Sequence, residues 1–308
     1  MLQPLADRIR RAPGLLGKRH LAVLRRLPGA HDGDDAAVLE RGGEFLLLCG
    51  EAIAPTLVAS DPFAAGVAAV VTNVSDIRAM GGRPLALVDM LVSPDRAHAE
   101  AVLDGIAWAA GLLGVDVAGG HLTIGHAGAL SASCTGVARR PLRAANARPG
   151  DRVLAAFCLE GRYAAGAGSL IFSSLRDRDP RRLREDGDAL VEVAEQGLCR
   201  AARDVSMPGA AGSLLQLLEG AGVGAVLDVE RVPRPAGVEL SRWLLTFPTF
   251  GFLLVAPPEL AERAAEPFTR RGLACAECGV LDDTRTLRLA AGGETALVWD
   301  LASEPLTR

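Results

Sequence analysis

The segment from residue 61 to residue 84 constrains the fold of this chain more than any other and reads DPFAAGVAAVVTNVSDIRAMGGRP. It begins with a helix start signal, because Asp61 can cap a helix and Pro62 suits the first helical position. It ends with Gly81 and Gly82, which stop a helix and suit a tight turn. The segment therefore predicts one helix of small apolar residues that lies buried in the fold.

Four polar side chains interrupt this helix: Thr72, Asn73, Ser75 and Asp76. Asn73 and Asp76 are three positions apart, so they share one helix face. A buried face holds a carboxylate and a carboxamide only when both have partners. Because a metal ion or a charged ligand would supply those partners, the pair predicts a binding site.

Length and composition allow a large folded protein, since the chain has 308 residues, of which 49% are hydrophobic. This is enough for one large domain or two ordinary ones with a sizeable core. Helix patterns cover residues 61–82, 94–113 and 180–203, and strand patterns cover residues 45–49, 85–92, 129–137 and 152–158. Helices and strands alternate in both halves, which predicts an α/β or α+β fold with two lobes.

A turn signal, ARPGD at residues 147–151, marks the expected boundary between the two lobes. We expect an N-terminal domain at residues 1–146 and a C-terminal domain at residues 147–308. The first 30 residues resemble an arm with a short helix near residues 17–27.

Charge and hydropathy exclude several function classes. The net charge of −4 gives no electrostatic reason to expect a nucleic-acid partner. No apolar run approaches the roughly 20 residues of a membrane span, and the start of the chain lacks the apolar core of a signal peptide. We therefore expect a soluble, cytoplasmic protein without a nucleic-acid or membrane partner.

Acidic residues are the main candidates for metal ligands. Asp32, Asp34 and Asp35 place three carboxylates in four positions of a glycine-bearing turn, where they repel one another unless a cation lies among them. Hard oxygen ligands of this kind suit magnesium, which then carries the phosphates of a nucleotide. A solvated acidic turn is the alternative. Three further acids are candidates: Glu51, Asp76 and Asp204.

Lys18 is the single lysine among 33 basic residues. Its compact charge on a flexible stem suits phosphate contact or proton transfer, although chance is an alternative explanation. The chain has no GxxxxGK[ST] phosphate loop and no GxSxG nucleophile motif. His121 and His126 lie on a glycine-rich loop, but two histidines alone do not define a metal site.

The six cysteines are scattered along the chain, and most are expected to be small buried hydrophobic residues. Cys275 and Cys278 form the single CxxC pair. Without a second pair or a nearby histidine, this gives only weak support for a zinc or redox site.

Four motifs in order along the chain resemble those of the PurM-like superfamily. They are GDDAAV at 33–38, TNVSDIRAMGGRP at 72–84, AGGHLT at 118–123 and DVSMPGAAGSL at 204–214. That superfamily includes aminoimidazole ribonucleotide (AIR) synthetase, thiamine-monophosphate kinase, selenophosphate synthetase and a hydrogenase maturation factor. The resemblance extends over most of the chain, from about residue 15 to residue 281. The chain looks like a side branch of AIR-synthase-related or selenophosphate-synthetase-related proteins.

The resemblance implies a two-lobed α+β fold. The N-terminal, ATP-binding lobes would pair into a shared β-barrel across a homodimer, and the C-terminal lobe would be an α/β sandwich. It also implies ATP and Mg²⁺ as cofactors and a phosphotransferase or synthetase reaction. The acceptor, a small molecule, cannot be derived from the motifs.

The resemblance also implies roles for individual residues. The acids that hold magnesium would be Asp34, Asp35, Glu51, Asp76 and Asp204. The nucleotide site would include Asn73, Asp76, Gly119 and Gly120. Lys18 would neutralise charge on the transferred phosphoryl group, and His121 would contact substrate or phosphate, or carry a proton.

Two enzyme branches compete, and a non-catalytic role is a further alternative. The GDDAAV motif is shared with thiamine-monophosphate kinase, although that kinase usually has GGD where this chain has GGH. Selenophosphate synthetase has GGH, but a cysteine or selenocysteine precedes its lysine, and here no cysteine precedes Cys49. Alternatively, the chain is a nucleotide-binding dimer without turnover, which acts as a scaffold or regulator of a partner enzyme.

Overall fold

The computed structural model describes residues 2–27, 33–164 and 168–307, and the chain forms two compact units. Unit 1 comprises Met1–Asp34, Leu142–Arg178 and Glu192–Arg308, and unit 2 comprises Asp35–Pro141 and Asp179–Val191. The expected domains at residues 1–146 and 147–308 stay a prediction. The two units are groups of residues that pack together in space, and such groups do not define domain boundaries along the sequence.

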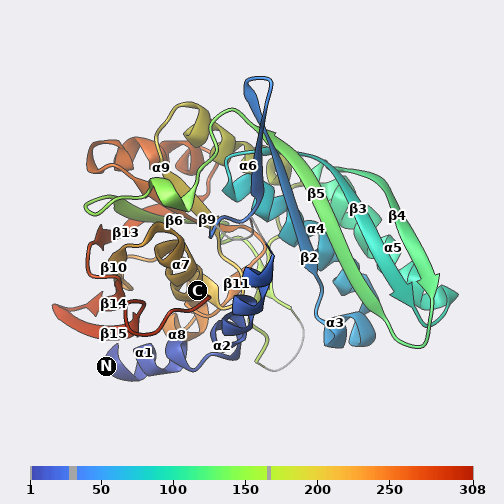
Figure 1. Cartoon of the computed structure of the whole chain (residues 1–308), viewed down its shortest axis with the longest axis horizontal. Helices are drawn as coiled ribbons and strands as arrows, with labels where there is room; N and C mark the ends of the chain where they lie inside the picture. The colour runs from blue at the N-terminus through green and yellow to red at the C-terminus, as the bar shows by residue number, and fades with distance from the viewer. Residues whose placement is uncertain (1, 28–32, 165–167, 308) are drawn as a thin grey trace. The chain divides into compact units, whose positions relative to one another are not determined.

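Unit 2 is one five-stranded sheet with helices along one face (Figure 1). Its strands are β1 (Ala37–Arg41), β2 (Glu44–Ala52), β3 (Arg83–Ser93), β4 (Asp116–Ile124) and β5 (Ala129–Ala138), in the order β1-β2-β5-β3-β4. Its helices are α3 (Pro55–Ser60), α4 (Pro62–Ala79), α5 (Arg96–Leu113) and the first part of α6 (Pro180–Glu195). Strands β3 and β4 are parallel, and the other neighbours are antiparallel.

Helix α4 confirms the helix expected after Asp61. The Asp61 carboxylate accepts a hydrogen bond from the backbone N–H of Ala64 at 2.9 Å, and Pro62 is the first helical residue. The helix ends at Ala79, and Gly81 has a φ of +71°, which a glycine adopts without strain.

Helices α4 and α5 cross with their backbones in contact. A Cβ atom on Gly66 would lie 2.1 Å from the carbonyl oxygen of Val102. A Cβ atom on Gly105 would lie 2.1 Å from the carbonyl oxygen of Phe63. The crossing therefore requires glycine at both positions, and it brings α4 and α5 together above the sheet.

The two faces of this sheet differ. Alternate residues of β3, such as Leu87 and Leu91, are buried on the face that α4 and α5 cover. On the other face, four apolar side chains remain between 39% and 51% exposed, and we call these the open face: Leu39, Leu48, Val88 and Met90.

Unit 1 contains a seven-stranded sheet in the order β15-β14-β10-β13-β6-β12-β9 and a small sheet in the order β11-β8-β7. The large sheet consists of β6 (Arg152–Phe157), β9 (Ala201–Asp204), β10 (Gly224–Asp228), β12 (Gly251–Ala256), β13 (Ala274–Asp282), β14 (Thr286–Ala291) and β15 (Glu294–Asp300). The small sheet consists of β7 (Arg162–Tyr163), β8 (Ile171–Ser173) and β11 (Phe247–Pro248).

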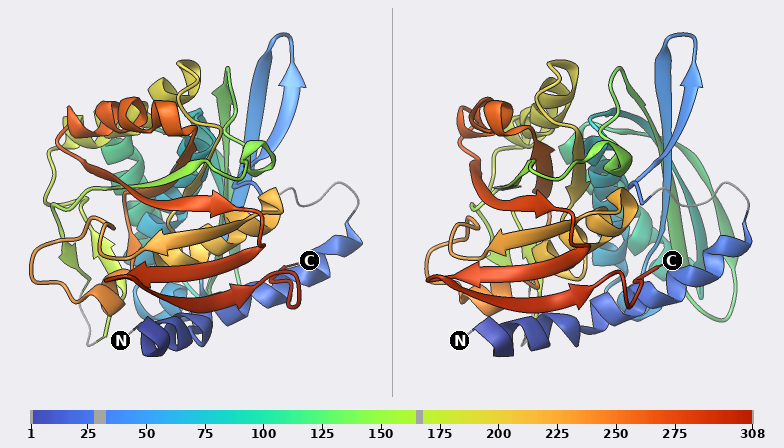
Figure 2. Two further views of the ribbon diagram at one scale, coloured as in Figure 1. Left: turned by 90° about the vertical axis from the view of Figure 1, so that its left-hand side faces the viewer. Right: turned by 60° about the vertical axis from the view of Figure 1, so that its left-hand side comes forward.

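The helices of unit 1 are α1 (Leu2–Arg10), α2 (Pro13–Lys18), α7 (Gly209–Ala221), α8 (Leu240–Trp243) and α9 (Ala261–Thr269), with 3₁₀ turns η1 (Arg19–Arg26), η2 (Ala144–Asn146) and η3 (Pro258–Leu260). Figure 2 shows α1 running beside β15 at the edge of the large sheet.

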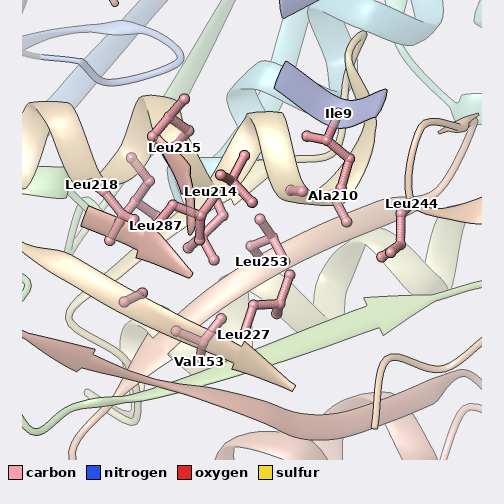
Figure 3. Packing of buried hydrophobic residues seen from close by; sticks show 14 of the residues in the cluster. Ile9, Val153, Ala210, Leu214, Leu215, Leu218, Leu227, Leu244, Leu253 and Leu287 are labelled. Atoms are coloured by element: carbon pink, nitrogen blue, oxygen red, sulfur yellow. The ribbon is translucent and has the colours of Figure 1, made fainter. Parts of the chain in front are cut away.

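The main core of unit 1 lies where α1 and α7 pack on the large sheet. Leu253 of β12 joins Ile9 of α1 and Leu214 of α7 in one buried cluster (Figure 3). The next residue, Leu254, points to the opposite face, since strand residues alternate. Helix α9 packs on β6 and β13.

One sequence expectation about a helix is wrong, and another is incomplete. The helix expected at residues 180–203 ends at Glu195, because Gly197 takes a left-handed φ of +66° and the chain then enters β9. The short helix expected near residues 17–27 corresponds to the 3₁₀ turn η1 (Arg19–Arg26), and the sequence analysis did not predict α1 and α2 before it. No helix in the described part of the chain is long and apolar enough to cross a membrane.

Candidate functional site

Two carboxylates of unit 2, those of Asp35 and Asp76, lie close together. Each offers an oxygen within 4.8 Å of the other, and Asp76 is 7% exposed on α4. Two like charges at this distance repel strongly when solvent is largely excluded. Because carboxylate oxygens are the ligands that Mg²⁺ takes in proteins, the pair fits a divalent cation.

A pair of cysteines lies on the same side of the sheet as Asp76. Cys49 of β2 and Cys134 of β5 are directly opposite each other in the antiparallel register. Burial, and then the Asp76 charge, raise the pKa of the Cys134 thiol to about 12 and that of the Cys49 thiol far above its ordinary value. Both thiols therefore stay protonated and can donate hydrogen bonds beside the carboxylate.

Asn73 is fully buried, and its side chain bonds within unit 2. Its Nδ2 donates to the carbonyl oxygen of Ala69 at 2.8 Å, and its Oδ1 accepts from the Cys49 thiol at 3.4 Å. The amide thus ties α4 to β2 one helical turn from Asp76. In this arrangement Asn73 holds the helix that presents the acid.

Glu51 lies two residues after Cys49 on β2, so its side chain leaves the strand on the same face. Its charge contributes to the raised pKa of Cys49. Glu51 is exposed, whereas Asp76 is buried. The structure thus places Glu51 and Asp76 on one side of the sheet.

Asp34 belongs to unit 1, and its carboxylate is already engaged there. It accepts a hydrogen bond from Nε of Arg143 at 2.9 Å and one from the backbone N–H of Ala144 at 2.7 Å. These contacts fix the chain immediately before Asp35. Asp32, the third carboxylate of the acidic turn, lies outside the described residues.

Gly119, Gly120 and His121 lie on β4, every residue of which is exposed. A Cβ atom on Gly120 would lie 2.2 Å from Oδ1 of Asp89, so position 120 faces the side of the sheet that the helices cover. His121 is the next residue and pairs with Met90, so it lies on the open face. Unit 2 therefore does not bring His121 and Asp76 together.

Asp89 is an acid that the sequence reading missed. It is 5% exposed on β3, and burial raises the pKa of its carboxyl group. The sequence could have indicated that Asp89 is buried, because position 89 falls between Leu87 and Leu91 on one face of a strand that alternates buried and exposed residues.

Arg78 is the second missed residue, although it lies in the same motif as Asp76. Burial lowers the pKa of its guanidinium to about 10, against the opposing effect of Asp188 and Asp186. A Cβ atom on Gly187 would lie 2.1 Å from Nε of Arg78. Arg78 thus packs against the middle of α6 within unit 2.

The remaining candidates belong to unit 1. Lys18 is the last residue of α2, and the next residue, Arg19, forms an ion pair with Glu304 at 3.1 Å. Asp204 is 4% exposed at the end of β9, where it pairs with Phe252 of β12. The expectation that Asp204 ends a long helix is wrong, since α6 stops nine residues earlier, at Glu195.

The cysteine pair Cys275 and Cys278 lies on β13. Burial raises the pKa of Cys275 to about 12 and that of Cys278 above its ordinary value. Thiols that stay protonated are poor nucleophiles.

Comparison with known proteins identifies the family. Residues 33–139 match "AIR synthase related protein, N-terminal domain", and residues 161–292 match "AIR synthase related protein, C-terminal domain". Together with the two mixed α+β units, these matches define a protein of the PurM-like superfamily. The chain belongs to the AIR synthase related family.

Two relatives by sequence match most or all of this chain. The chain is 35% identical to the uncharacterized protein sll0787 of Synechocystis, over 100% of this chain and 98% of that protein. It is 31% identical to a selenide, water dikinase of Geobacter metallireducens, over 73% of this chain and 67% of that protein.

Solved structures share the fold. T. maritima PurL complexed with ATP superimposes with a TM-score of 0.77 at 22% identity, over 92% of this chain and 48% of PurL. The chain thus spans about half the length of PurL. AaThiL complexed with AMPPCP and TMP superimposes with a TM-score of 0.68 at 20% identity, over 90% of this chain and 95% of AaThiL.

Proposed function

We propose that this protein is a magnesium-dependent enzyme that uses ATP to phosphorylate or activate a small acceptor. The observation that carries the proposal is the carboxylate pair of Asp35 and Asp76, held within 4.8 Å in unit 2, where Asp76 is 7% exposed. Two relatives by fold are complexed with ATP or AMPPCP, and one relative by sequence is named a selenide, water dikinase, which supports the same chemistry here.

The roles follow from what phosphoryl transfer needs. Magnesium bound by the carboxylates would neutralise phosphate charge as the transfer proceeds. Asp35 and Asp76 are proposed as its first two ligands, and Cys49 and Asn73 hold α4 so that Asp76 keeps its position. Of the two acids Asp34 and Asp35, we assign the metal to Asp35, because its carboxylate lies within 4.8 Å of that of Asp76.

Four further assignments remain proposals from the motifs. Glu51 and Asp204 would add oxygen ligands, and Lys18 would neutralise charge on the transferred group. Gly119 and Gly120 would let a phosphate approach the backbone of β4, because neither carries a Cβ atom.

Calorimetric titration of ATP into the full chain, with and without Mg²⁺, tests the proposal. We expect binding that requires Mg²⁺ in the wild type and is lost in Asp76→Asn. Asp104→Asn is the matched control, because Asp104 is an exposed acid on α5 of the same unit. Binding without Mg²⁺, or equal binding by Asp76→Asn, would contradict the proposal.

The same samples separate the alternatives that the motifs leave open. Release of ADP on addition of thiamine monophosphate would assign the kinase reaction. Mg²⁺-dependent binding of ATP with no ADP formed over a broad acceptor screen would favour the non-catalytic scaffold or regulator.

We also propose that two copies of the chain pair through the open face to form a homodimer. The apolar side chains Leu39, Leu48, Val88 and Met90 lie exposed on one sheet face, and exposed apolar patches of this kind mark interaction surfaces. His121 lies on the same face, so the dimer would place it at the interface.

Sedimentation of two matched variants tests the dimer. Val88 and Leu103 are each 39% exposed, but Val88 is on the open face and Leu103 is on α5. We expect Val88→Lys to be monomeric and Leu103→Lys to keep the mass of a dimer. A wild type that sediments as a monomer at tens of micromolar would refute the pairing.

A further inference from the structure

Unit 1 contains a cavity of about 460 Å³ beside the N-terminal helices. Its apolar wall includes Leu170, Met207 and Leu245, and the link between α1 and α2 closes it on another side. Two arginines, Arg8 and Arg11, also line it. Small-molecule sites are typically of this size, mostly apolar, with a few polar groups that fix orientation.

The walls of this cavity are held in place by contacts within unit 1. A Cβ atom on Gly14 would lie 3.2 Å from Cβ of Pro208, so the arm packs directly on the segment that follows β9. That segment is pinned by hydrogen bonds from Val205 to Gly251 at 2.8 Å and from Ser206 to Ser213 at 3.0 Å.

The arm itself is also anchored. Arg10 forms an ion pair with Glu304 at 2.7 Å, and Arg19 forms one with the same carboxylate at 3.1 Å. One acid of the C-terminal segment thus holds both sides of the link that closes the cavity. The cavity is therefore largely formed before any ligand binds.

The charge at the cavity favours an anion. Arg8 donates to Ser241 and lies 4.0 Å from Glu239, so its charge is partly balanced. Arg11 is exposed, and within the described ranges of the chain no ion pair of Arg11 is found. A guanidinium beside an apolar wall suits a molecule with an apolar body and one carboxylate or phosphate.

We propose that this cavity binds the acceptor substrate, and that the acceptor is a small anion with an apolar skeleton. The proposal rests on the proposed function. Met207 in the cavity wall follows Asp204, a proposed magnesium ligand, by three residues, so their Cα atoms are at most about 11 Å apart. A ligand against Met207 therefore lies near one of the residues assigned to the chemistry.

Phosphoryl transfer from ATP to such an acceptor needs no further reactant. An acceptor oxygen forms a bond to the γ-phosphorus of ATP, and the bond from that phosphorus to ADP breaks. ADP leaves with the electron pair. A carboxylate acceptor needs no base, and a hydroxyl acceptor releases its proton to water.

Titration of three aromatic probes into the full chain tests the inference. The probes are 2-naphthoate, 2-naphthyl phosphate and neutral 2-naphthol. We expect at least one anion to bind about tenfold tighter than 2-naphthol, and whichever anion binds identifies carboxylate or phosphate recognition.

Variants then locate the binding. Arg11→Gln should weaken anion binding about three- to tenfold, as expected for one exposed cation. Met207→Glu should weaken anion binding further, because it places a negative charge in the cavity wall. The variant should fold, since Met207 is 41% exposed and tolerates a polar side chain. Arg263→Gln on α9 is the matched control, since Arg263 is exposed in unit 1 and does not line the cavity.

Failure of the inference is distinct from failure of the proposed function. Anion binding no tighter than 2-naphthol binding, or equal in wild type and Arg11→Gln, overturns the acceptor site even if Mg²⁺-dependent ATP binding is intact. Competition of ATP with the bound anion would also overturn it, because the cavity would then take the nucleotide. Anion binding that depends on Arg11, in a protein that binds no ATP, would support the anion site and contradict the proposed ATP-dependent function.

Discussion

Replacing Asp76 by Asn should stabilise the metal-free protein. Two unit charges at 4.8 Å, the upper limit of the distance between the two carboxylate oxygens, repel by about 3.5 kcal/mol at an effective dielectric constant of 20, and by about 0.9 kcal/mol in bulk water. Asp76 is 7% exposed, so the upper figure is closer to its surroundings. Other partners of the two acids reduce the net gain, and we expect Asp76→Asn to raise the free energy of unfolding by about 1–3 kcal/mol.

Magnesium should reverse the order of stability of the wild type and Asp76→Asn. In the wild type a bound cation turns repulsion into attraction, so its stability should rise with Mg²⁺ concentration as for any ligand that binds only the folded state. Asp76→Asn has lost one charged ligand, so its stability should change little. Chemical denaturation followed by circular dichroism, in EDTA and in millimolar MgCl₂, measures both effects.

One result would refute this reasoning. If Asp76→Asn is less stable than the wild type in EDTA, and Mg²⁺ stabilises both proteins equally, the two carboxylates do not repel and do not share a cation. Asp104→Asn serves as control, because an exposed acid on α5 should change stability by less than about 0.5 kcal/mol.

Two further predictions concern packing and protonation in unit 2. Gly66→Ala should lower the free energy of unfolding by several kcal/mol, because its Cβ atom would overlap the carbonyl oxygen of Val102. Gly111→Ala on α5 meets no atom within 4 Å and should raise that free energy by about 0.5–1 kcal/mol. Thermal denaturation measures both changes. The pKa of the Cys134 thiol is raised from 9.0 to about 12 in the folded state. The protonated thiol therefore contributes its full share to the free energy of unfolding below pH 9, and this contribution is lost as the pH rises through 12. Denaturation between pH 8 and pH 11 should therefore show a smaller alkaline loss of stability in Cys134→Ala than in the wild type; equal slopes would contradict the assignment.

The local signals that predicted α4 were strong because they act within a few residues. Asp61 caps the helix and Pro62 begins it, as the sequence indicated, and Gly81 ends the following turn. The PurM-like resemblance, carried by four motifs, is confirmed by the family matches. The burial of most cysteines is confirmed as well.

What the sequence could not supply depends on contacts between distant residues. Asp34 and Asp35 are neighbours with the same side chain, and the structure distinguishes them by the contacts of Asp34 with Arg143 and Ala144 and by the position of Asp35 beside Asp76. The face on which His121 lies follows from the register of β3 with β4, which no local pattern determines. Arg78 similarly gains its role from residues more than 100 positions later, in the middle of α6.

The most direct test of the central claim is anomalous diffraction from crystals of the full chain grown with Mn²⁺ and a non-hydrolysable ATP analogue. The account predicts an anomalous peak at bonding distance, about 2–2.5 Å, from carboxylate oxygens of Asp35 and Asp76. A nucleotide whose metal peak lies away from both carboxylates, or no peak at this pair, would contradict it.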